Sequence, residues 1–167
     1  MTGMNKRLFL GVCITPFLFA CSTSSRKQSA TAATSPSYPN NPAKRQDIVL
    51  QAMAMLDHSY TYGGKKMHTG FDCSGLVSFV YKESAGISLK GSAAQMAGVT
   101  QSIDPSFANP GDLVFFNTLG SSFSHVGIYI GSGKFIHAAN EKTGVKTERL
   151  SHAYWSKRFE GYRTIFA

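Results

Sequence analysis

One cysteine stands where a loop turns into an apolar run with helical spacing. Cys73 follows Asp72, a common helix-capping type, and apolar side chains recur three, four and seven positions later at Leu76, Val77 and Val80. The first turn of a helix has unpaired N–H groups and the positive end of the dipole, which favour a thiolate and can hold an oxyanion. The position suits a nucleophile; the alternative is a small buried core cysteine.

A cysteine nucleophile needs a base, and the base needs an orienting group. His125 opens an apolar, strand-like segment and His137 lies within the next one. Either histidine alone would be read as structural, but two on successive strands favour a catalytic pair. Side chains alternate along strands, so the two rings share a face only if the turn is odd-numbered or bulged. We predict such a turn near residues 131–133, and we expect Gly127 to leave room for a substrate.

The N-terminal residues 1–20 have the layout of a secretory signal. Lys6 and Arg7 precede an apolar run that Pro16 breaks and that is too short to span a membrane well. The segment Leu18-Phe19-Ala20-Cys21 resembles a bacterial lipoprotein cleavage box. The resemblance implies that Cys21 is lipidated and anchors the chain to a membrane, and Ser22 resembles the pattern sorted to an outer membrane. The alternative is an ordinary secreted protein cut nearby.

The cysteine count strengthens the nucleophile hypothesis. The chain has three cysteines; Cys13 would leave with the signal and Cys21 would carry lipid, so Cys73 remains as the single thiol of the folded part. Exported proteins usually pair their thiols, and a leftover cysteine indicates a reactive role. Residues 21–43 are rich in Ser, Thr, Ala, Pro and Asn and predict a flexible tether.

The remaining residues, 44–167, predict a single α+β domain. Helices are expected at residues 44–58, from Cys73 to near Gly86, and at residues 92–97. The first helix is expected to bury Val49, Ala52, Met53 and Leu56. After a turn at residues 109–112 the pattern alternates, and it predicts strands at residues 113–116, 125–130, 134–138, 145–148 and 162–166.

Four blocks together resemble the NlpC-type family of bacterial cell-wall cysteine peptidases. They are Phe71–Val77, Gly111–Phe116, His125–Gly131 and Phe135–Ala138. The resemblance covers nearly all of residues 44–167. It implies a papain-like core, with N-terminal helices packed on a C-terminal antiparallel sheet of about five or six strands. It also implies that Cys73 is the nucleophile, His125 the base and His137 the orienting residue.

The same resemblance suggests residues that surround the reacting bond. Tyr60 matches a family tyrosine near the nucleophile and is expected to assist the oxyanion hole. Asp72 would bind a substrate amine or merely cap the helix. Three further expected substrate-binding residues are Ser74, Ser92 and Gln95. Lys90-Gly91 replaces a proline-arginine pair of many relatives, and lysine lacks arginine's bidentate contact, which affects stem-peptide preference rather than the chemistry.

The implied activity is hydrolysis of peptidoglycan stem peptides, most often at the γ-linkage from D-glutamate to the diamino acid, diaminopimelate. We expect a thiolate–imidazolium pair of Cys73 and His125, with a thiol pKa well below about 8.5, and an acyl-enzyme intermediate. One cysteine with scattered histidines lacks zinc-ligand spacing, so no metal or other cofactor is expected. The alternatives are an amidase cutting between sugar and peptide, an acyltransferase, or a non-enzymatic wall-binding lipoprotein.

The charge of the chain fits an acidic partner in the cell envelope. The formal net charge is +8, and removal of Lys6 and Arg7 leaves fifteen basic and nine acidic residues, a net charge of +6. Peptidoglycan carboxylates and anionic lipids are such partners, and a generally soluble basic surface is the alternative. An exported lipoprotein is not expected to bind nucleic acid. The sequence predicts a place in the periplasm, at the inner side of an outer membrane, and leaves the oligomeric state open.

Overall fold

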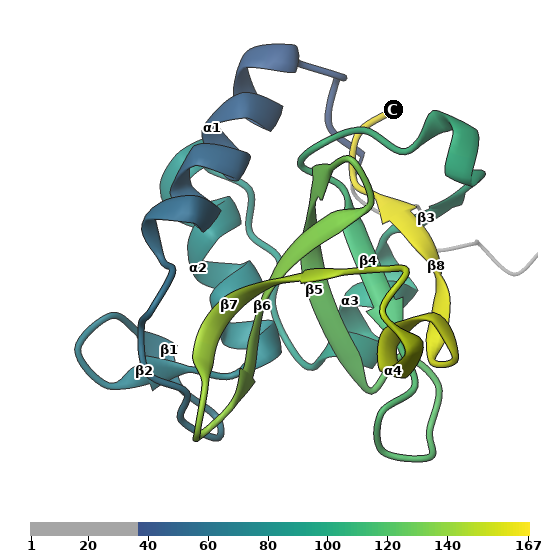
Figure 1. Ribbon diagram of the computed structural model, residues 1–167. Helices are drawn as coiled ribbons and strands as arrows, with labels where there is room; N and C mark the ends of the chain where they lie inside the picture. Colours follow the sequence, from purple (N-terminus) through teal and green to yellow (C-terminus); the bar gives the residue numbers. More distant parts are fainter. Residues whose placement is uncertain (1–36) are drawn as a thin grey trace, which may run out of the picture. The chain divides into compact units, whose positions relative to one another are not determined.

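The computed structural model describes residues 37–167, which Figure 1 shows in colour. The predicted signal at residues 1–20, the predicted lipid acceptor Cys21 and most of the predicted tether lie outside the described residues. Within residues 37–167, no helix is both long enough and apolar enough to cross a membrane.

The folded region starts before the predicted boundary at residue 44. Helix α1 spans Pro42–Ala54, and the Asn41 side chain caps it by accepting the Ala43 N–H at 3.0 Å. Proline suits the first helical position because the N–H that it lacks would have no partner there. Upstream, Tyr38 N–H donates to the Ile165 carbonyl at 2.9 Å, so this stretch is tied to the C-terminal residues.

The buried face of α1 matches the prediction only in part, since Ala52 is buried and Leu56 packs against the core as expected. Ile48, Ala52 and Met55 are buried, whereas Met53 is 43% exposed. The predicted apolar face omitted Ile48 and began at the next residue. Because successive residues of an α-helix are about 100° apart around its axis, a shift of one residue turns the expected face by that angle. A one-residue error in phase is therefore enough to expose a side chain that was expected in the core.

Helix α2 spans Cys73–Ala85 and lies beside α1 on one side of the sheet (Figure 1). It ends as predicted, at Gly86, whose φ of +68° is the left-handed conformation that glycine adopts most readily. A short ladder joins β1, Lys65–Lys66, to β2, Gly70–Phe71, just before the helix begins. Helix α3, Ala93–Val99, follows α2 and carries a capping box of Ser92 and Gln95.

A six-stranded antiparallel sheet forms the second half of the domain and confirms the predicted α+β class. Its spatial order is β3-β8-β4-β5-β6-β7 (Figure 1). The strands are β3 Gln101–Ile103, β4 Leu113–Phe116, β5 His125–Gly131, β6 Lys134–Asn140, β7 Gly144–Arg149 and β8 Phe159–Thr164. A 3₁₀ turn, Pro105–Phe107, precedes β4, and a single helical turn, α4 at Ala153–Ser156, lies between β7 and β8.

Successive residues of the central strands point to opposite faces of the sheet and pack into two separate hydrophobic cores. Val126 and Ile128 of β5 face the helices and join the main core. On the opposite face, Val114, Phe116 and Phe135 pack with Trp155 in a smaller aromatic core. The sheet is therefore buried on both faces in its middle, and this second face is the one that carries the two predicted catalytic histidines.

Candidate active site

Cys73 is the first residue of α2, a free thiol that is partly exposed to solvent. Asp72 caps the helix: its Oδ1 accepts the Gly75 N–H at 2.6 Å and the Ser74 hydroxyl at 3.0 Å. Asp72 therefore caps the helix, and its contact with a substrate amine stays a prediction. The Gly64 carbonyl accepts the Asp72 N–H at 3.0 Å, and a side chain on Gly75 would collide with this carbonyl. The two glycines thus let the preceding loop fix the helix start.

His125 and His137 form a hydrogen-bonded pair. His125 Nε2 lies 2.8 Å from His137 Nδ1, and the two rings are almost perpendicular, with an interplanar angle of 85°. His125 is 8% exposed and His137 is fully buried. The structure therefore brings together the two histidines that the sequence pairs.

The turn between β5 and β6 is bulged, as the shared face of the histidines requires. Ile128 pairs with Ile136 and Tyr129 with Phe135, but the next pair is Gly131 with Lys134, so Ile130 is the extra residue. The bulge permits a two-residue turn and still places His125 and His137 on one face. This prediction from strand alternation is confirmed.

The prediction that Gly127 leaves room for a substrate is wrong. A Cβ on Gly127 would lie 2.7 Å from Phe135 Cδ2 and 3.4 Å from His137 Cβ. The Phe135 ring, the Ile136 carbonyl oxygen and the His137 Cβ fill the space above this glycine, so no room is left there for a substrate. Gly127 allows the close packing that seats the histidine pair.

Trp155 of α4 is a site residue that the sequence analysis missed. Its indole stacks on the His125 ring at 5.5 Å and 27°, and its plane meets the His137 ring nearly at a right angle, with centroids 4.7 Å apart. Phe116 and Phe135 flank the same pair. The signal in the sequence is only that the single tryptophan of the chain lies in an otherwise polar segment.

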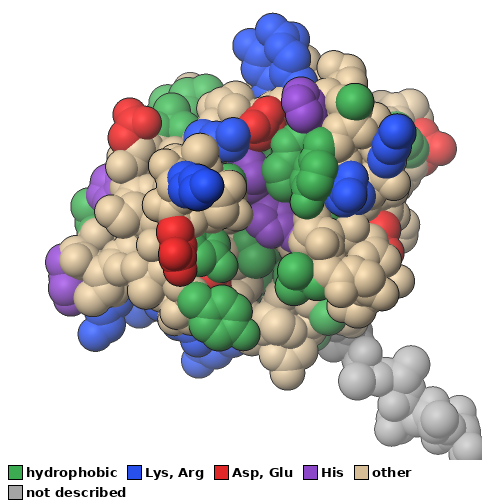
Figure 2. Space-filling model, turned by 60° about the horizontal axis from the view of Figure 1, so that its bottom comes forward, with side chains coloured by type: hydrophobic (Ala, Val, Ile, Leu, Met, Phe, Trp, Pro, Cys, Tyr) green, Lys and Arg blue, Asp and Glu red, His purple; other side chains and the backbone are tan. Residues whose placement is uncertain are grey.

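Cys73 and His125 line the same cavity, which we call the central cavity. It has a volume of about 330 Å³, and Tyr154 and Trp155 form part of its wall. Figure 2 looks onto this face and shows histidine side chains recessed in a hollow between apolar side chains. A substrate carbonyl entering this hollow would reach both the sulfur and the imidazole.

A second cavity, the α3 cavity, extends from Cys73 towards the start of α3 and has a volume of about 610 Å³. Predicted site residues line it: Asp72, Ser74, Ser92 and Gln95. Gln95 Oε1 accepts the Ser92 N–H at 2.9 Å and the Ser92 hydroxyl oxygen accepts the Gln95 N–H at 3.4 Å. These two residues therefore shape the cavity wall through the helix cap, and their substrate contacts stay a prediction. The loop residues Leu119 and Ser121–Ser124 complete the cavity.

Tyr60 lies beside the start of α2, as predicted. It forms an isolated parallel bridge with Phe71, and its side chain lines the central cavity. Burial, followed by the charges of Cys73 and Asp72, raises the pKa of the Tyr60 hydroxyl. The hydroxyl consequently remains protonated near neutral pH and can donate a hydrogen bond to an oxyanion.

The electrostatics of the resting site differ from the predicted thiolate–imidazolium pair. Burial raises the pKa of the Cys73 thiol, and the Asp72 charge raises it further, against the backbone N–H groups of Val126, Ser74 and Cys73 itself. Burial also lowers the pKa of His125 to about 4, although Asp72 favours its protonation. The pKa of His137 is lowered by burial, then by His125 and Lys146. The site as folded favours a neutral thiol beside neutral imidazoles, because desolvation penalises every charge.

His137 Nε2 is buried and has no hydrogen-bond partner within residues 37–167. If His125 is to accept a proton on Nδ1, its Nε2 must carry hydrogen and donate to His137 Nδ1. His137 then carries its own hydrogen on the orphaned Nε2.

Among residues 37–167, no group of three His, Cys, Asp or Glu side chains is arranged to hold a metal ion.

Several characterised proteins resemble this chain in sequence. It is 39% identical over 117 residues to the gamma-DL-glutamyl hydrolase of Bacillus subtilis, an alignment that covers 70% of this chain and 28% of that protein. It is 37% identical over 116 residues to the murein DD-endopeptidase MepH of Escherichia coli, covering 68% of this chain and 43% of that protein. The chain spans less than half the length of these curated relatives.

Solved structures and a family model agree with these alignments. A Staphylococcus aureus protein described as similar to a lipoprotein of the NLP/P60 family superposes with a TM-score of 0.68 at 35% identity, covering 80% of this chain and 45% of that one. The NlpC/p60 domain of the peptidoglycan hydrolase SagA superposes with a TM-score of 0.60 at 30% identity, covering 72% of this chain and 97% of that one. The model of the NlpC/P60 family matches residues 57–164, a range that contains Cys73, His125 and His137. This chain belongs to the NlpC/P60 family.

Proposed function

We propose that the protein is a peptidoglycan hydrolase, a cysteine endopeptidase that cleaves amide bonds in stem peptides. The observation that carries the proposal is the histidine pair: His125 and His137 are bonded at 2.8 Å, and His125 shares the central cavity with Cys73. A nucleophile, a base and an orienting group in one hollow are what acyl transfer requires. Membership of the NlpC/P60 family, whose relatives are named as hydrolases and endopeptidases, supports the same assignment.

The proposed reaction starts from the neutral site. As the Cys73 sulfur attacks the amide carbonyl, His125 takes the thiol proton on Nδ1, while its Nε2–H donates to His137 Nδ1. The Cys73 N–H at the helix N-terminus and the Tyr60 hydroxyl stabilise the oxyanion. His125 then gives the proton to the leaving amine, and water, deprotonated by His125, hydrolyses the thioester. His137 fixes the tautomer and orientation of His125, as the third member of a triad does.

The proposed bond is the γ-linkage between D-glutamate and diaminopimelate. The Bacillus subtilis relative carries the name of a gamma-DL-glutamyl hydrolase, and a second relative from that organism is named a bifunctional muramidase/DL-endopeptidase. The Escherichia coli relative, at similar identity, is instead named a DD-endopeptidase. Product analysis must therefore identify the bond as well as the activity.

The test is a digest of purified peptidoglycan with the full-length protein and with its Cys73→Ala variant, followed by mass analysis of the released fragments. The proposal expects fragments that begin with the free amine of the diamino acid, and expects them only from the wild-type protein. Equal release by both proteins, or release by neither, rejects the peptidase. Free glycan with intact stem peptides would instead indicate an amidase, and transfer to an added amine would indicate an acyltransferase.

We further propose that lipid on Cys21 holds the enzyme at the inner face of the outer membrane, where stem peptides are within reach of the tether. The support is the cleavage box at residues 18–21 and the solved relative described as similar to a lipoprotein. Labelled palmitate should enter the wild-type protein and not the Cys21→Ala variant, and only the wild type should sediment with outer membranes. Incorporation that persists without Cys21 would reject the anchor.

A further inference from the structure

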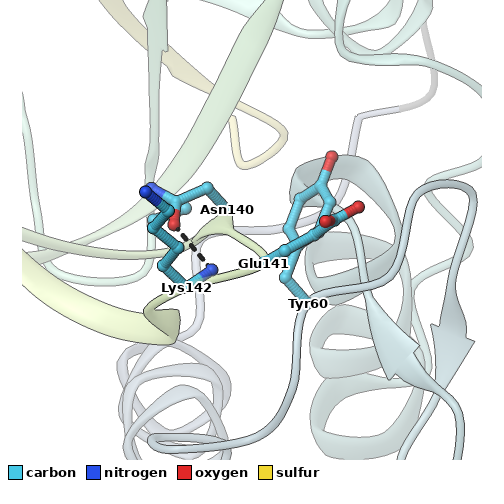
Figure 3. A pocket seen from close by; sticks show the side chains of 5 residues that line it. Tyr60, Asn140, Glu141 and Lys142 are labelled. Carbon is cyan, nitrogen blue, oxygen red and sulfur yellow. Dashed lines mark hydrogen bonds between the residues drawn. The ribbon is translucent and has the colours of Figure 1, made fainter.

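A third cavity continues the groove beyond the central cavity, at the tip of the β6–β7 hairpin (Figure 3). We call it the hairpin cavity; it has a volume of about 520 Å³ and is lined by Tyr60, Ala139, Asn140, Glu141 and Lys142. Tyr60, Ala139 and Asn140 also line the central cavity. A substrate held at the sulfur can therefore extend into the hairpin cavity without a break.

The chemistry of the proposed reaction decides which half of the substrate lies there. His125 must protonate the leaving amine, so the leaving group lies on the His125 side of the scissile bond. His125 lines the central cavity and neither of its two neighbours. The α3 cavity shares Cys73 with the central cavity and so lies on the side of the sulfur. The hairpin cavity shares Ala139 and Asn140 of β6, the strand that carries His137, the hydrogen-bond partner of His125. The hairpin cavity adjoins the central cavity, so it receives the leaving-group side, which in the proposed function is the diamino acid.

The hairpin cavity has a fixed wall. Asn140 Oδ1 accepts the N–H groups of Lys142 at 3.0 Å and Thr143 at 3.2 Å, which closes the tip of the hairpin. The base of the hairpin is tied to the preceding loop, because the Val145 N–H donates to the His58 carbonyl at 2.9 Å. A wall whose backbone is held at both ends loses little conformational entropy when a ligand binds.

The cavity presents one negative and one positive side chain that are not paired with each other. Glu141 and Lys142 form no ion pair within residues 37–167. In Figure 3 the Glu141 carboxylate projects to the Tyr60 side of the turn, whereas the Lys142 side chain extends to the Asn140 side. The side-chain oxygen of Asn140, Oδ1, already accepts hydrogen bonds within the turn. The side-chain NH₂ group of Asn140 is therefore available to donate to a ligand alongside Lys142.

Diaminopimelate matches this arrangement of charges. Its free end carries an ammonium and a carboxylate on one carbon, whereas lysine at the same stem position carries an ammonium alone. We propose that the hairpin cavity binds this zwitterionic end, with Lys142 and Asn140 at the carboxylate and Glu141 and the Tyr60 ring at the ammonium. The inference rests on the proposed function and adds a specificity site to it.

The test compares two soluble stem peptides that differ only in a diaminopimelate or a lysine after γ-D-glutamate. The full-length protein should cleave the diaminopimelate peptide with a kcat/KM about five- to tenfold higher, the scale of one partly screened charge contact. Lys142→Gln should remove this preference by slowing the diaminopimelate peptide alone. Glu141→Gln should slow both peptides by a similar factor, because both carry the ammonium. Lys157→Gln, which removes an exposed charge at the C-cap of α4, is the matched control and should change neither rate.

The outcomes separate the two proposals. Equal rates for the two wild-type reactions, or a preference that survives Lys142→Gln, overturn the inference while the proposed function stands. Cleavage of neither peptide by the wild-type protein rejects the proposed function, and the inference falls with it. If Lys157→Gln changed the rates as much as Lys142→Gln, the preference for diaminopimelate would come from the overall charge of the protein. That result would also overturn the inference that the hairpin cavity causes the preference.

Discussion

The Cys73 thiol is expected to remain protonated in the resting protein, and the pH dependence of its alkylation tests this. A thiol with the ordinary pKa of about 8.5 is ionised to about 0.3% at pH 6 and about 3% at pH 7. Burial raises the pKa of Cys73 above that value, so the ionised fraction is smaller still. Because the thiolate is the reactive species, the iodoacetamide rate should rise about tenfold per pH unit from about pH 6 to 8.

A preformed ion pair would behave differently. Its thiolate would persist between the pKa of the thiol and that of the imidazolium, and the alkylation rate would be nearly flat across that range. The neutral site makes a second prediction: since uncharged His125 adds no field at the sulfur above about pH 6, His125→Ala should leave the alkylation profile within about threefold of wild type. The same variant should abolish hydrolysis, because no base remains.

The assay follows loss of free thiol in the full-length protein, with a small peptide thiol alkylated in parallel to correct for the reagent. Far-ultraviolet circular dichroism at each pH confirms that the fold persists. A plateau between about pH 5 and 8 that disappears in His125→Ala would refute the argument from burial. The ion pair would then be the resting state, and Asp72, whose charge favours a protonated His125, would be the first residue to examine.

Three further predictions follow from the histidine pair and its surroundings. His125 has a pKa of about 4 in the fold and about 6.5 when unfolded, so as pH falls the unfolded chain binds a proton that the folded chain does not. His125 alone should lower the unfolding free energy by about 3 kcal/mol between pH 7 and 4 in urea denaturation, and His137, whose pKa is also lowered by burial, adds to this loss. An unchanged midpoint would contradict the depressed pKa values. Trp155→Ala should lower the unfolding free energy by about 3–5 kcal/mol and reduce kcat more than it raises KM, whereas Trp155→Phe should retain most activity; equal activity of the two variants would exclude a role for the stacked ring. Gly127→Ala should cost about 1–3 kcal/mol, since the new methyl group meets Phe135, and thermal melting of the variant measures it.

The sequence predicts the active site well where the chemistry imposes a local pattern. The Asp72–Cys73 cap needs only neighbouring residues, and the structure has it. The bulge before Lys134 was predicted because two histidines on adjacent strands share a face only with an irregular turn. Five of the six strands of the antiparallel sheet likewise follow from alternation and turn residues, whereas β3 was not predicted from the pattern.

Other features depend on which segments meet in space, and the sequence does not show that. The error at Met53 of α1 arose because several apolar residues stand near one another, and packing against α2 and β5 decides which of them are buried. Trp155 reaches the histidines from a segment beyond β7, so no spacing connects them. The protonation of the resting site also depends on which segments meet in space. Burial, which the sequence does not show, is the main cause of the raised pKa of Cys73 and of the lowered pKa of His125.

The register of one hairpin links folding to catalysis in this domain. Val126 and Ile128 fill the main core on one face of β5, so the other face must carry His125. The main core thereby fixes where the His125 ring, the proposed base, points, since a one-residue slip would bury this ring among the helices and expose the core. The bulged residue Ile130 then brings β6 into a register that sets His137 beside His125. Cys73, the proposed nucleophile, is placed separately by the cap of α2, and the packing of α2 on β5 joins the two halves of the site. The geometry of the site is therefore as rigid as the core that holds these two elements together, and variants that loosen this core should lose activity before they unfold.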